Sequence, residues 1–424
     1  MLDIRTIRDN TTAVKLGCEN KKQSVRIDEI LQLDEERRRA IHEGERLKSE
    51  RNSTSAEIAS RKKRGENCSE LIAEMKAVSA RIKSIDAKRG EVEGRLGELL
   101  AWVPNMPHES VPHGASEKDN AEVSRWGEEP VFEFEPKDHI ELGESLGLLR
   151  PDIGAKITGT GFPLYAGTGA LLERALINFM LDRHAAAGYC EVFPPFLANE
   201  ASHFGVGQLP KAREQMYFID EDALFCIPTA EVPVTNIHRD EILAVDQLPL
   251  RYCAYSACFR REAGSYGKDT KGLLRVHQFN KVELVKFVEP AGSYDELESL
   301  RADAEGILRA LGLHYRVLVL CDADLSFASA KCYDIEVWAP GERKYLEVSS
   351  CSNFESFQAR RMNVRYRSSP GAKPEFVHTL NGSGVATPRL MVALLESYQT
   401  ARGTVKIPEL LRPYLHGLSE IGAP

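Results

Sequence analysis

Side chains that could handle a nucleotide are concentrated between residues 258 and 283 of this chain. Alternate residues of a β-strand share one face, so Phe279, Lys281 and Glu283 should point the same way. An arginine on the partner strand, such as Arg260, should lie opposite them. A guanidinium group binds phosphate, an aromatic ring meets a base and a carboxylate accepts from an amine, so this surface suits a nucleotide. A charged hairpin with one aromatic residue in the core is the alternative.

The stretch inside this segment, residues 264–272, has the Gly, Ser and Lys content of a flexible hairpin lid. Its Gly267-Lys268-Asp269 portion has a faint likeness to a phosphate-binding loop. It lacks the glycine spacing and the final hydroxyl of the G-x-x-x-x-G-K-[ST] pattern, so we do not expect P-loop chemistry.

Three further clusters place polar residues where a core would be apolar. They are Thr229-Ala230-Glu231, Glu347-Val348-Ser349-Ser350 and Asn381-Gly382-Ser383-Gly384, the last followed by Arg389 and an apolar helix at 390–395. A Gly-Ser-Gly turn before a helix is commonly a plain cap, but it also lets a backbone approach a ligand closely.

Strands and helices that alternate beyond residue 109 would position these clusters. β-rich runs are expected at 224–227, 277–288 and 333–338, and helices at 171–187 and 294–311. This mixture predicts an α+β domain that fills the remainder of the chain.

The N-terminal part predicts a long helical hairpin, because residues 27–102 contain no proline and their second half has a heptad pattern. Two series define the a/d stripe of a coiled coil: Leu71, Val78, Ile85, Val92 and Leu99, and Met75, Ile82, Arg89 and Leu96. Gly65 and Asn67 can reverse the chain, and about 35 residues per helix give a projection roughly 50 Å long. Pro104, Pro107 and Pro112 mark a linker behind it.

Charge is unevenly distributed along the chain. The net charge is −8, but residues 21–90 hold 18 Lys/Arg and 13 Asp/Glu, a balance of +5 that leaves −13 for the rest. A basic segment on an acidic body suggests that one part of the molecule makes anionic contacts. The arginines at 37–39 and the basic run at 61–64 could contact phosphates, and a dimerisation or scaffold coiled coil is the alternative.

Length and composition restrict the class of protein. A chain of 424 residues suggests two or three folding units. It has no apolar stretch of the roughly 18 to 20 residues that a membrane helix needs, and it opens without a secretory signal. We therefore expect a cytoplasmic protein with neither a membrane nor DNA as its partner. Nine scattered cysteines without a C-x-x-C pair favour buried thiols over disulfides or a zinc site.

Together these motifs resemble those of the class II aminoacyl-tRNA synthetases. Motif 1 corresponds to residues 161–196, motif 2 to 258–283 and motif 3 to 381–395. The forms found here are similar to those of the bacterial-type seryl-tRNA synthetase family, which also carries an N-terminal helical hairpin, so the resemblance covers essentially the full length. Arg261, where the family often has Ser, and Thr387-Pro388, where Val-Gly is common, are departures.

The resemblance implies a class II catalytic domain at 109–424, in which helices flank an antiparallel sheet. A tRNA-binding domain at 1–108, with a coiled-coil arm at about 27–101, would precede it. The implied enzyme is a homodimeric serine–tRNA ligase, which forms seryl-adenylate from serine and ATP and transfers the seryl group to the 3′ end of serine tRNA. Selenocysteine tRNA is a further candidate substrate. A related ligase that charges another carrier, and a structural coiled-coil protein with an inactive catalytic domain, are the alternatives.

The same resemblance implies roles for individual residues. Serine would bind to Thr229, Ala230, Glu231, Glu283 and Ser383. ATP would bind to Arg260, Arg261, Glu262, Val276, Phe279, Glu347, Val348, Ser349, Ser350 and Arg389. Arg260 and Arg389 would be catalytic, with Arg260 and the metal neutralising developing charge and Arg389 near the outer phosphates. Mg²⁺ would take oxygen ligands from Glu347 and Ser350. Which glutamate binds the serine ammonium and which binds the hydroxyl stays open.

Overall fold

The computed structural model describes residues 1–263 and 271–422. Most of the expected lid, including Gly267-Lys268-Asp269, therefore lies outside the described residues. The chain forms two compact units, one of Leu2–Pro104 and the other of Asn105–Pro424 together with Met1. No helix in the described ranges is both long enough and apolar enough to cross a membrane.

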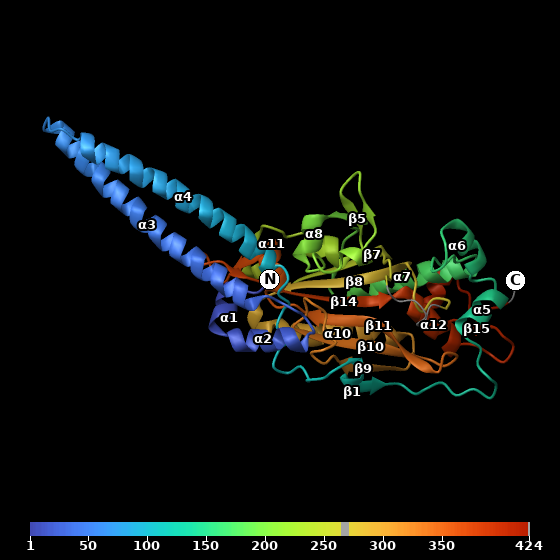
Figure 1. Ribbon diagram of the computed structural model, residues 1–424. Coiled ribbons are helices and arrows are strands. Elements are labelled where there is room, and N and C mark those ends of the chain that lie inside the picture. Colours follow the sequence, from blue (N-terminus) through green and yellow to red (C-terminus); the bar gives the residue numbers. More distant parts are fainter. Residues whose placement is uncertain (264–270, 423–424) are drawn as a thin grey trace. The chain divides into compact units, whose positions relative to one another are not determined.

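The N-terminal unit is helical and contains the predicted antiparallel arm (Figure 1). Its helices are α1 (Ile4–Asp9), α2 (Thr11–Asn20), α3 (Ile27–Lys63) and α4 (Ser69–Leu100). The buried residues of α4 include Met75, Ile82 and Leu96 of the predicted heptad seam. Gly44 of α3 is buried, and a Cβ atom there would lie 3.8 Å from Cγ2 of Ile85, so the two helices approach closely at this point. The coiled-coil prediction is confirmed.

The second unit is built on an eight-stranded sheet. In spatial order its strands are β1 (Ala121–Trp126), β9 (Tyr315–Val319), β10 (Lys331–Ala339), β11 (Lys344–Asn353), β14 (His378–Ala386), β8 (Gln278–Val288), β7 (Leu250–Phe259) and β2 (Cys190–Glu191). Neighbouring strands are antiparallel except for β2 and β7, which are parallel. This sheet confirms the predicted α+β class.

Three long helices and this sheet share the main hydrophobic core: α7 (Thr168–Ala186), α10 (Ser293–Ala310) and α12 (Thr387–Ser397). On β8, Val282 and Leu284 belong to this core, whereas Val285 and Phe287 belong to a second core. Because side chains alternate along a strand, Lys281 shares the face of Val285 and points away from the three helices. The odd-numbered residues of β8 are therefore the ones that can form a site.

The remaining elements are short. The helices are α5 (His139–Ser145), α6 (Pro151–Ile157), α8 (Glu200–Gly205), α9 (Glu231–Thr235) and α11 (Phe357–Met362), with 3₁₀ turns at Glu117–Asp119, Arg213–Gln215, Val245–Gln247, Pro290–Gly292 and Glu409–Leu415. The strands are β3 (Leu197–Asn199), β4 (Phe218–Ile219), β5 (Leu224–Cys226), β6 (Ile242–Ala244), β12 (Arg365–Arg367), β13 (Glu375–Phe376), β15 (Val405–Lys406) and β16 (Glu420–Ile421). All nine cysteines are free and seven of them are buried, as predicted.

Candidate active site

Two adjoining cavities lie over the central strands of the sheet. The smaller has a volume of about 240 Å³ and the larger about 620 Å³. Four residues line both cavities: Arg260, Lys281, Glu347 and Ser383. A molecule in one cavity can therefore meet a molecule in the other along this shared wall.

The β7–β8 hairpin supplies one side of the smaller cavity. Cys258 pairs with Phe279 in its register, and the backbone N–H of Arg260 donates to the His277 carbonyl at 2.8 Å. This holds the Arg260 guanidinium carbon 5.1 Å from the centroid of the Phe279 ring, a cation–π contact. The arginine and the aromatic ring thus meet as the strand alternation predicted.

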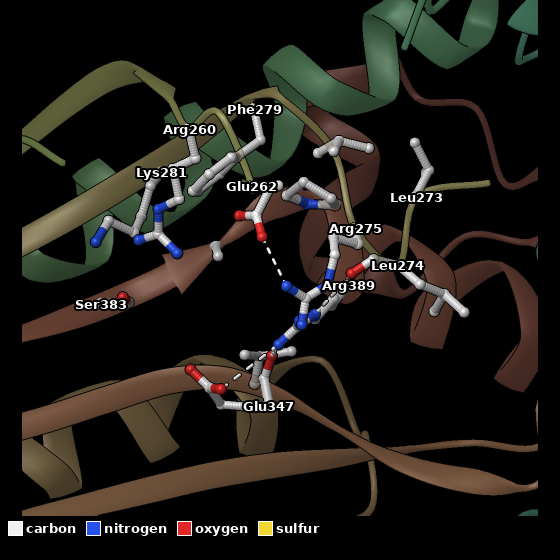
Figure 2. Close-up of a pocket in the computed structure, with 14 residues that line it drawn as sticks. Arg260, Glu262, Leu273, Leu274, Arg275, Phe279, Lys281, Glu347, Ser383 and Arg389 are labelled. Atoms are coloured by element: carbon white, nitrogen blue, oxygen red, sulfur yellow. Dashed lines mark hydrogen bonds and ion pairs between the residues drawn. The ribbon is translucent and has the colours of Figure 1, made fainter. Parts of the chain in front are cut away.

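Two further arginines point into the smaller cavity, and each is oriented by fixed partners (Figure 2). Arg275 pairs with Glu262 at 2.6 Å. Arg389 donates from Nε to the Leu274 carbonyl at 3.1 Å and from Nη1 to the Glu347 carbonyl at 2.8 Å. Together with Arg260, these groups give the cavity the cationic character that a polyphosphate needs.

The larger cavity contains a compact acidic cluster. Thr229 donates to the Glu283 carboxylate at 2.7 Å, and Lys281 forms an ion pair with the same carboxylate. Gln358 donates to the carboxylate of Glu231 at 2.7 Å. Burial, and then the Glu283 carboxylate, raise the pKa of Glu231 to about 7. The two acids therefore differ, because Glu283 has a cationic partner within the cluster and Glu231 has a neutral amide.

A bulge in β11 explains how Glu347 and Ser350 reach the same cavity although they are three residues apart. Ser349 pairs with Ile335 and Glu347 pairs with Glu336, so Val348 is an extra residue in β11. A bulge of this kind reverses the alternation of side chains beyond it. Both Glu347 and Ser350 consequently line the larger cavity.

Asp334 of β10 lies opposite Ser350 in the sheet. Burial and the nearby Glu347 carboxylate raise the pKa of Asp334 well above its usual range. Two carboxylates and a hydroxyl gathered in this way are the hard oxygen donors that Mg²⁺ prefers, so the residues present fit this ion.

Most residues singled out from the sequence line one of the two cavities. The smaller is lined by Arg260, Glu262, Val276, Phe279, Glu347, Val348 and Arg389, and the larger by Thr229, Glu231, Glu283, Ser350 and Ser383. Ala230, Arg261 and Ser349 are not among the lining residues. Arg261 donates to the Glu214 carbonyl at 3.4 Å, and Ser349 donates to the Ser383 carbonyl at 2.5 Å. Ala230 is a buried residue at the start of α9.

Local sequence patterns placed Lys281 on the strand face of Phe279 and Glu283 without giving it a role, and they did not point to Arg275 or Gln358. The role of Lys281 could have been inferred, because it lies two residues before Glu283 on the same strand face and carries the opposite charge. Arg275 carries no comparable signal, since its ion pair with Glu262 joins residues on opposite sides of the 264–272 stretch. Gln358 lies 127 residues from Glu231, and no local pattern connects them.

Comparisons with known proteins give a consistent result. Residues 1–107 match the seryl-tRNA synthetase N-terminal domain, and residues 217–398 match the tRNA synthetase class II core domain (G, H, P, S and T). A serine–tRNA ligase from Chloroherpeton thalassium is 58% identical over 431 residues, with 100% of both chains covered.

Two solved structures are also similar over the full length of the chain. The seryl-tRNA synthetase from Pyrococcus horikoshii complexed with ATP has 38% identity and a TM-score of 0.94, with 100% of both chains covered. The cytoplasmic serine–tRNA ligase from Naegleria fowleri in complex with AMP has 28% identity and a TM-score of 0.90, covering 100% of this chain and 99% of that one. The chain therefore belongs to the seryl-tRNA synthetases, the class II enzymes that act as serine–tRNA ligases.

Proposed function

We propose that this enzyme binds ATP in the smaller cavity and serine in the larger, and forms seryl-adenylate where the two meet. The observation that carries this proposal is the shared wall of Arg260, Lys281, Glu347 and Ser383. It allows the α-phosphate of a nucleotide on one side to face an amino-acid carboxylate on the other.

In the smaller cavity, the base lies against Phe279 and Val276 and the α-phosphate meets Arg260. The outer phosphates lie near Glu262 and Arg389. Support comes from the guanidinium of Arg260 over the Phe279 ring and from the two carbonyls that orient Arg389. The relatives from Pyrococcus horikoshii and Naegleria fowleri were solved with ATP and with AMP, which supports adenine-nucleotide binding by this enzyme.

Glu347 and Ser350 hold Mg²⁺ in this proposal, with Asp334 beside them. When bound, the ion would supply positive charge that offsets the negative charge of the phosphates. The β11 bulge supports the assignment, because it brings both oxygen donors to one cavity.

In the larger cavity, Glu231 binds the serine ammonium and Glu283 accepts from the serine hydroxyl. Glu283 already pairs with Lys281 and accepts from Thr229, which leaves little of its charge for a second cation. Glu231 forms no ion pair within the described ranges, and a ligand ammonium would supply the missing cation. Ser383 pairs with Glu283 in the sheet register and closes the hydroxyl pocket.

The chemistry then rests on positioning and electrostatics. A serine carboxylate oxygen attacks the α-phosphorus and pyrophosphate leaves, while Arg260 stabilises the charge that develops on the α-phosphate oxygens. The terminal ribose hydroxyl of the tRNA next attacks the carbonyl carbon of the adenylate, and AMP leaves. The direct test is ATP–pyrophosphate exchange with each amino acid in turn. Only serine should support rapid exchange, and exchange with another amino acid in its place would refute the pocket assignment.

We further propose that residues 1–108 form the tRNA-binding domain and residues 109–424 the catalytic domain, and that the arm contacts the tRNA backbone. In the arm, Arg37 and Arg38 form ion pairs with the buried Asp34 at 2.7 and 3.1 Å, so these two arginines already have a partner within the same helix. Lys62 and Lys63 at the tip form no ion pair within the described part of the chain and are available to phosphates. Aminoacylation assays with serine tRNA and selenocysteine tRNA decide which is charged.

A cytoplasmic homodimer completes the proposal. Phe193, in the motif 1 segment, is 76% exposed and lies beside Phe196 and Tyr255, with ring centroids 5.8 and 6.1 Å away. Exposed aromatic residues of this kind often mark a protein interface. The nearby β2 is an edge strand of the main sheet. The Naegleria fowleri relative, described as cytoplasmic, supports the location.

A further inference from the structure

A buried histidine outside the two cavities connects three distant parts of the catalytic unit. His139 is the first residue of α5 and is fully buried, as is Glu396 of α12. The Nδ1 atom of His139 lies 3.1 Å from Oε1 of Glu396. On the other side of the ring, Nε2 accepts the backbone N–H of Leu273 at 3.1 Å.

The surrounding groups determine where the imidazole carries its proton. A backbone N–H can only donate, so Nε2 must offer its lone pair to Leu273, and the proton of the neutral ring resides on Nδ1. Nδ1 then donates to Glu396. That carboxylate also accepts the backbone N–H groups of His139, Gly341 and Glu342, at 2.9, 2.9 and 3.1 Å.

A metal ion is not the natural occupant of this cluster. Ligand atoms of His139, Glu342 and Glu396 do lie within 4.8 Å of one another. The lone pair of Nε2 and both oxygens of Glu396 are already used by N–H donors, however. The arrangement instead orients a histidine ring within the fold.

The residue held by His139 belongs to the wall of the smaller cavity. Leu273 and Leu274 both line that cavity. Gly272, just before them, has a φ of +57°, and a Cβ atom there would lie 2.1 Å from Nε2 of His139. The main chain at 272–273 therefore packs directly on the imidazole ring.

Helix α12 holds this segment at two points. Arg389 donates to the Leu274 carbonyl, and Glu396 acts through His139 on the Leu273 N–H. The two α12 residues are seven apart, which is about two helical turns and places them on the same side of the helix. The helix that carries a phosphate-binding arginine is thus also tied to the backbone that returns from the 264–270 stretch.

We propose that His139 is a positioning residue for ATP. Its Nε2 atom fixes the main chain at Leu273, and its pairing with Glu396 keeps this wall of the nucleotide cavity in a constant position relative to Arg389. This inference rests on the proposed binding of ATP in the smaller cavity. It assigns no contact between His139 and substrate, so loss of the histidine should weaken ATP use and leave serine use largely intact.

The test compares His139→Gln with His139→Asn in serine-dependent pyrophosphate exchange. The longer glutamine can present its carbonyl oxygen to the Leu273 N–H, whereas asparagine is too short. His139→Asn should raise the KM for ATP about tenfold, because it leaves a buried N–H without an acceptor. Its serine KM should change little, and His139→Gln should recover most of the ATP affinity. Hydrogen exchange of the Leu273 amide should be faster in His139→Asn than in His139→Gln.

A matched control separates positioning from general stability. His314 is also buried in this unit, and its ring bonds to the Trp126 carbonyl and the Tyr345 hydroxyl, away from both cavities. His314→Asn should lower the melting temperature without an ATP-specific defect. If His139→Asn does not fold, Gly272→Ala disturbs the same contact from the other side and should raise the KM for ATP.

The results that would refute the positioning role differ from those that would refute the proposed function. Failure of the unmodified enzyme to catalyse serine-dependent exchange would remove the proposed function itself. An active enzyme whose His139→Asn and His139→Gln variants keep the original KM for ATP, or lose ATP and serine affinity equally, would overturn the positioning role.

Discussion

The acidic cluster in the larger cavity leads to a quantitative prediction about pH. Burial, and then Glu283, raise the pKa of Glu231 to about 7. An ammonium ligand needs this carboxyl in its ionised form. With that pKa, about nine tenths of Glu231 is ionised at about pH 8 and about one tenth at about pH 6. The kcat/KM for serine should therefore fall nearly tenfold over this interval, since this parameter reports ionisations of the free enzyme.

Substitution of the carboxylate should remove both the contact and its pH dependence. Glu231→Gln keeps the size of the side chain but carries no charge. We expect the kcat/KM for serine at about pH 8 to fall by about 10- to 100-fold, the range for a hydrogen bond to a charged group. The acid limb should disappear in this variant, and the KM for ATP should change little. Pyrophosphate exchange at subsaturating serine and saturating ATP measures each quantity.

The neighbouring acid provides an internal control. Glu283→Gln removes the carboxylate that helps to raise the pKa of Glu231 and leaves the Lys281 ammonium nearby. The acid limb should persist in this variant but move to lower pH. A wild-type profile that is flat between about pH 6 and 8, or a Glu231→Gln profile with the wild-type limb, would refute the assignment of Glu231 to the ammonium.

Three further predictions concern the nucleotide, the tRNA and the dimer. Arg260→Ala should reduce pyrophosphate exchange by about 10²- to 10³-fold, whereas the control Arg125→Ala should not, because Arg125 is exposed and lies outside both cavities. If the Arg260→Ala rate is close to that of the control, the phosphate assignment is contradicted. Replacing residues 30–97 with a short Gly-Ser bridge should leave pyrophosphate exchange intact and abolish charging of serine tRNA. Charging by the full-length enzyme should weaken steeply as the salt concentration rises. If the shortened protein charges serine tRNA as well as the full-length enzyme, the arm is purely structural. Phe193→Glu should shift the sedimentation profile toward monomer, whereas the control Val131→Glu, at a 94% exposed position, should not. If the unmodified enzyme sediments as an active monomer, the dimer is excluded.

Local patterns in the sequence were sufficient to predict the main helices and strands and several residues of the site. The heptad spacing in 69–100 predicted the buried seam at Met75, Ile82 and Leu96, because helical periodicity is a property of neighbouring residues. The alternation of Phe279, Lys281 and Glu283 predicted a common face for the same reason. The motif resemblance then supplied the remaining candidates, most of which line one of the two cavities.

Other features of the site depend on long-range packing, which local patterns cannot encode. The difference between the two acids arises from partners in separate segments: Glu283 meets Thr229, and Glu231 meets Gln358, over separations of 54 and 127 residues. Ser350 faces the cavity only because β11 carries one residue more than β10 at the bulge. The order of the residues sets which side chains are available and the period on which they repeat. Which of them carry charge, and which backbone they hold, depends on burial and on contacts such as that of His139 with Glu396, which form only when residues far apart in the chain are packed together.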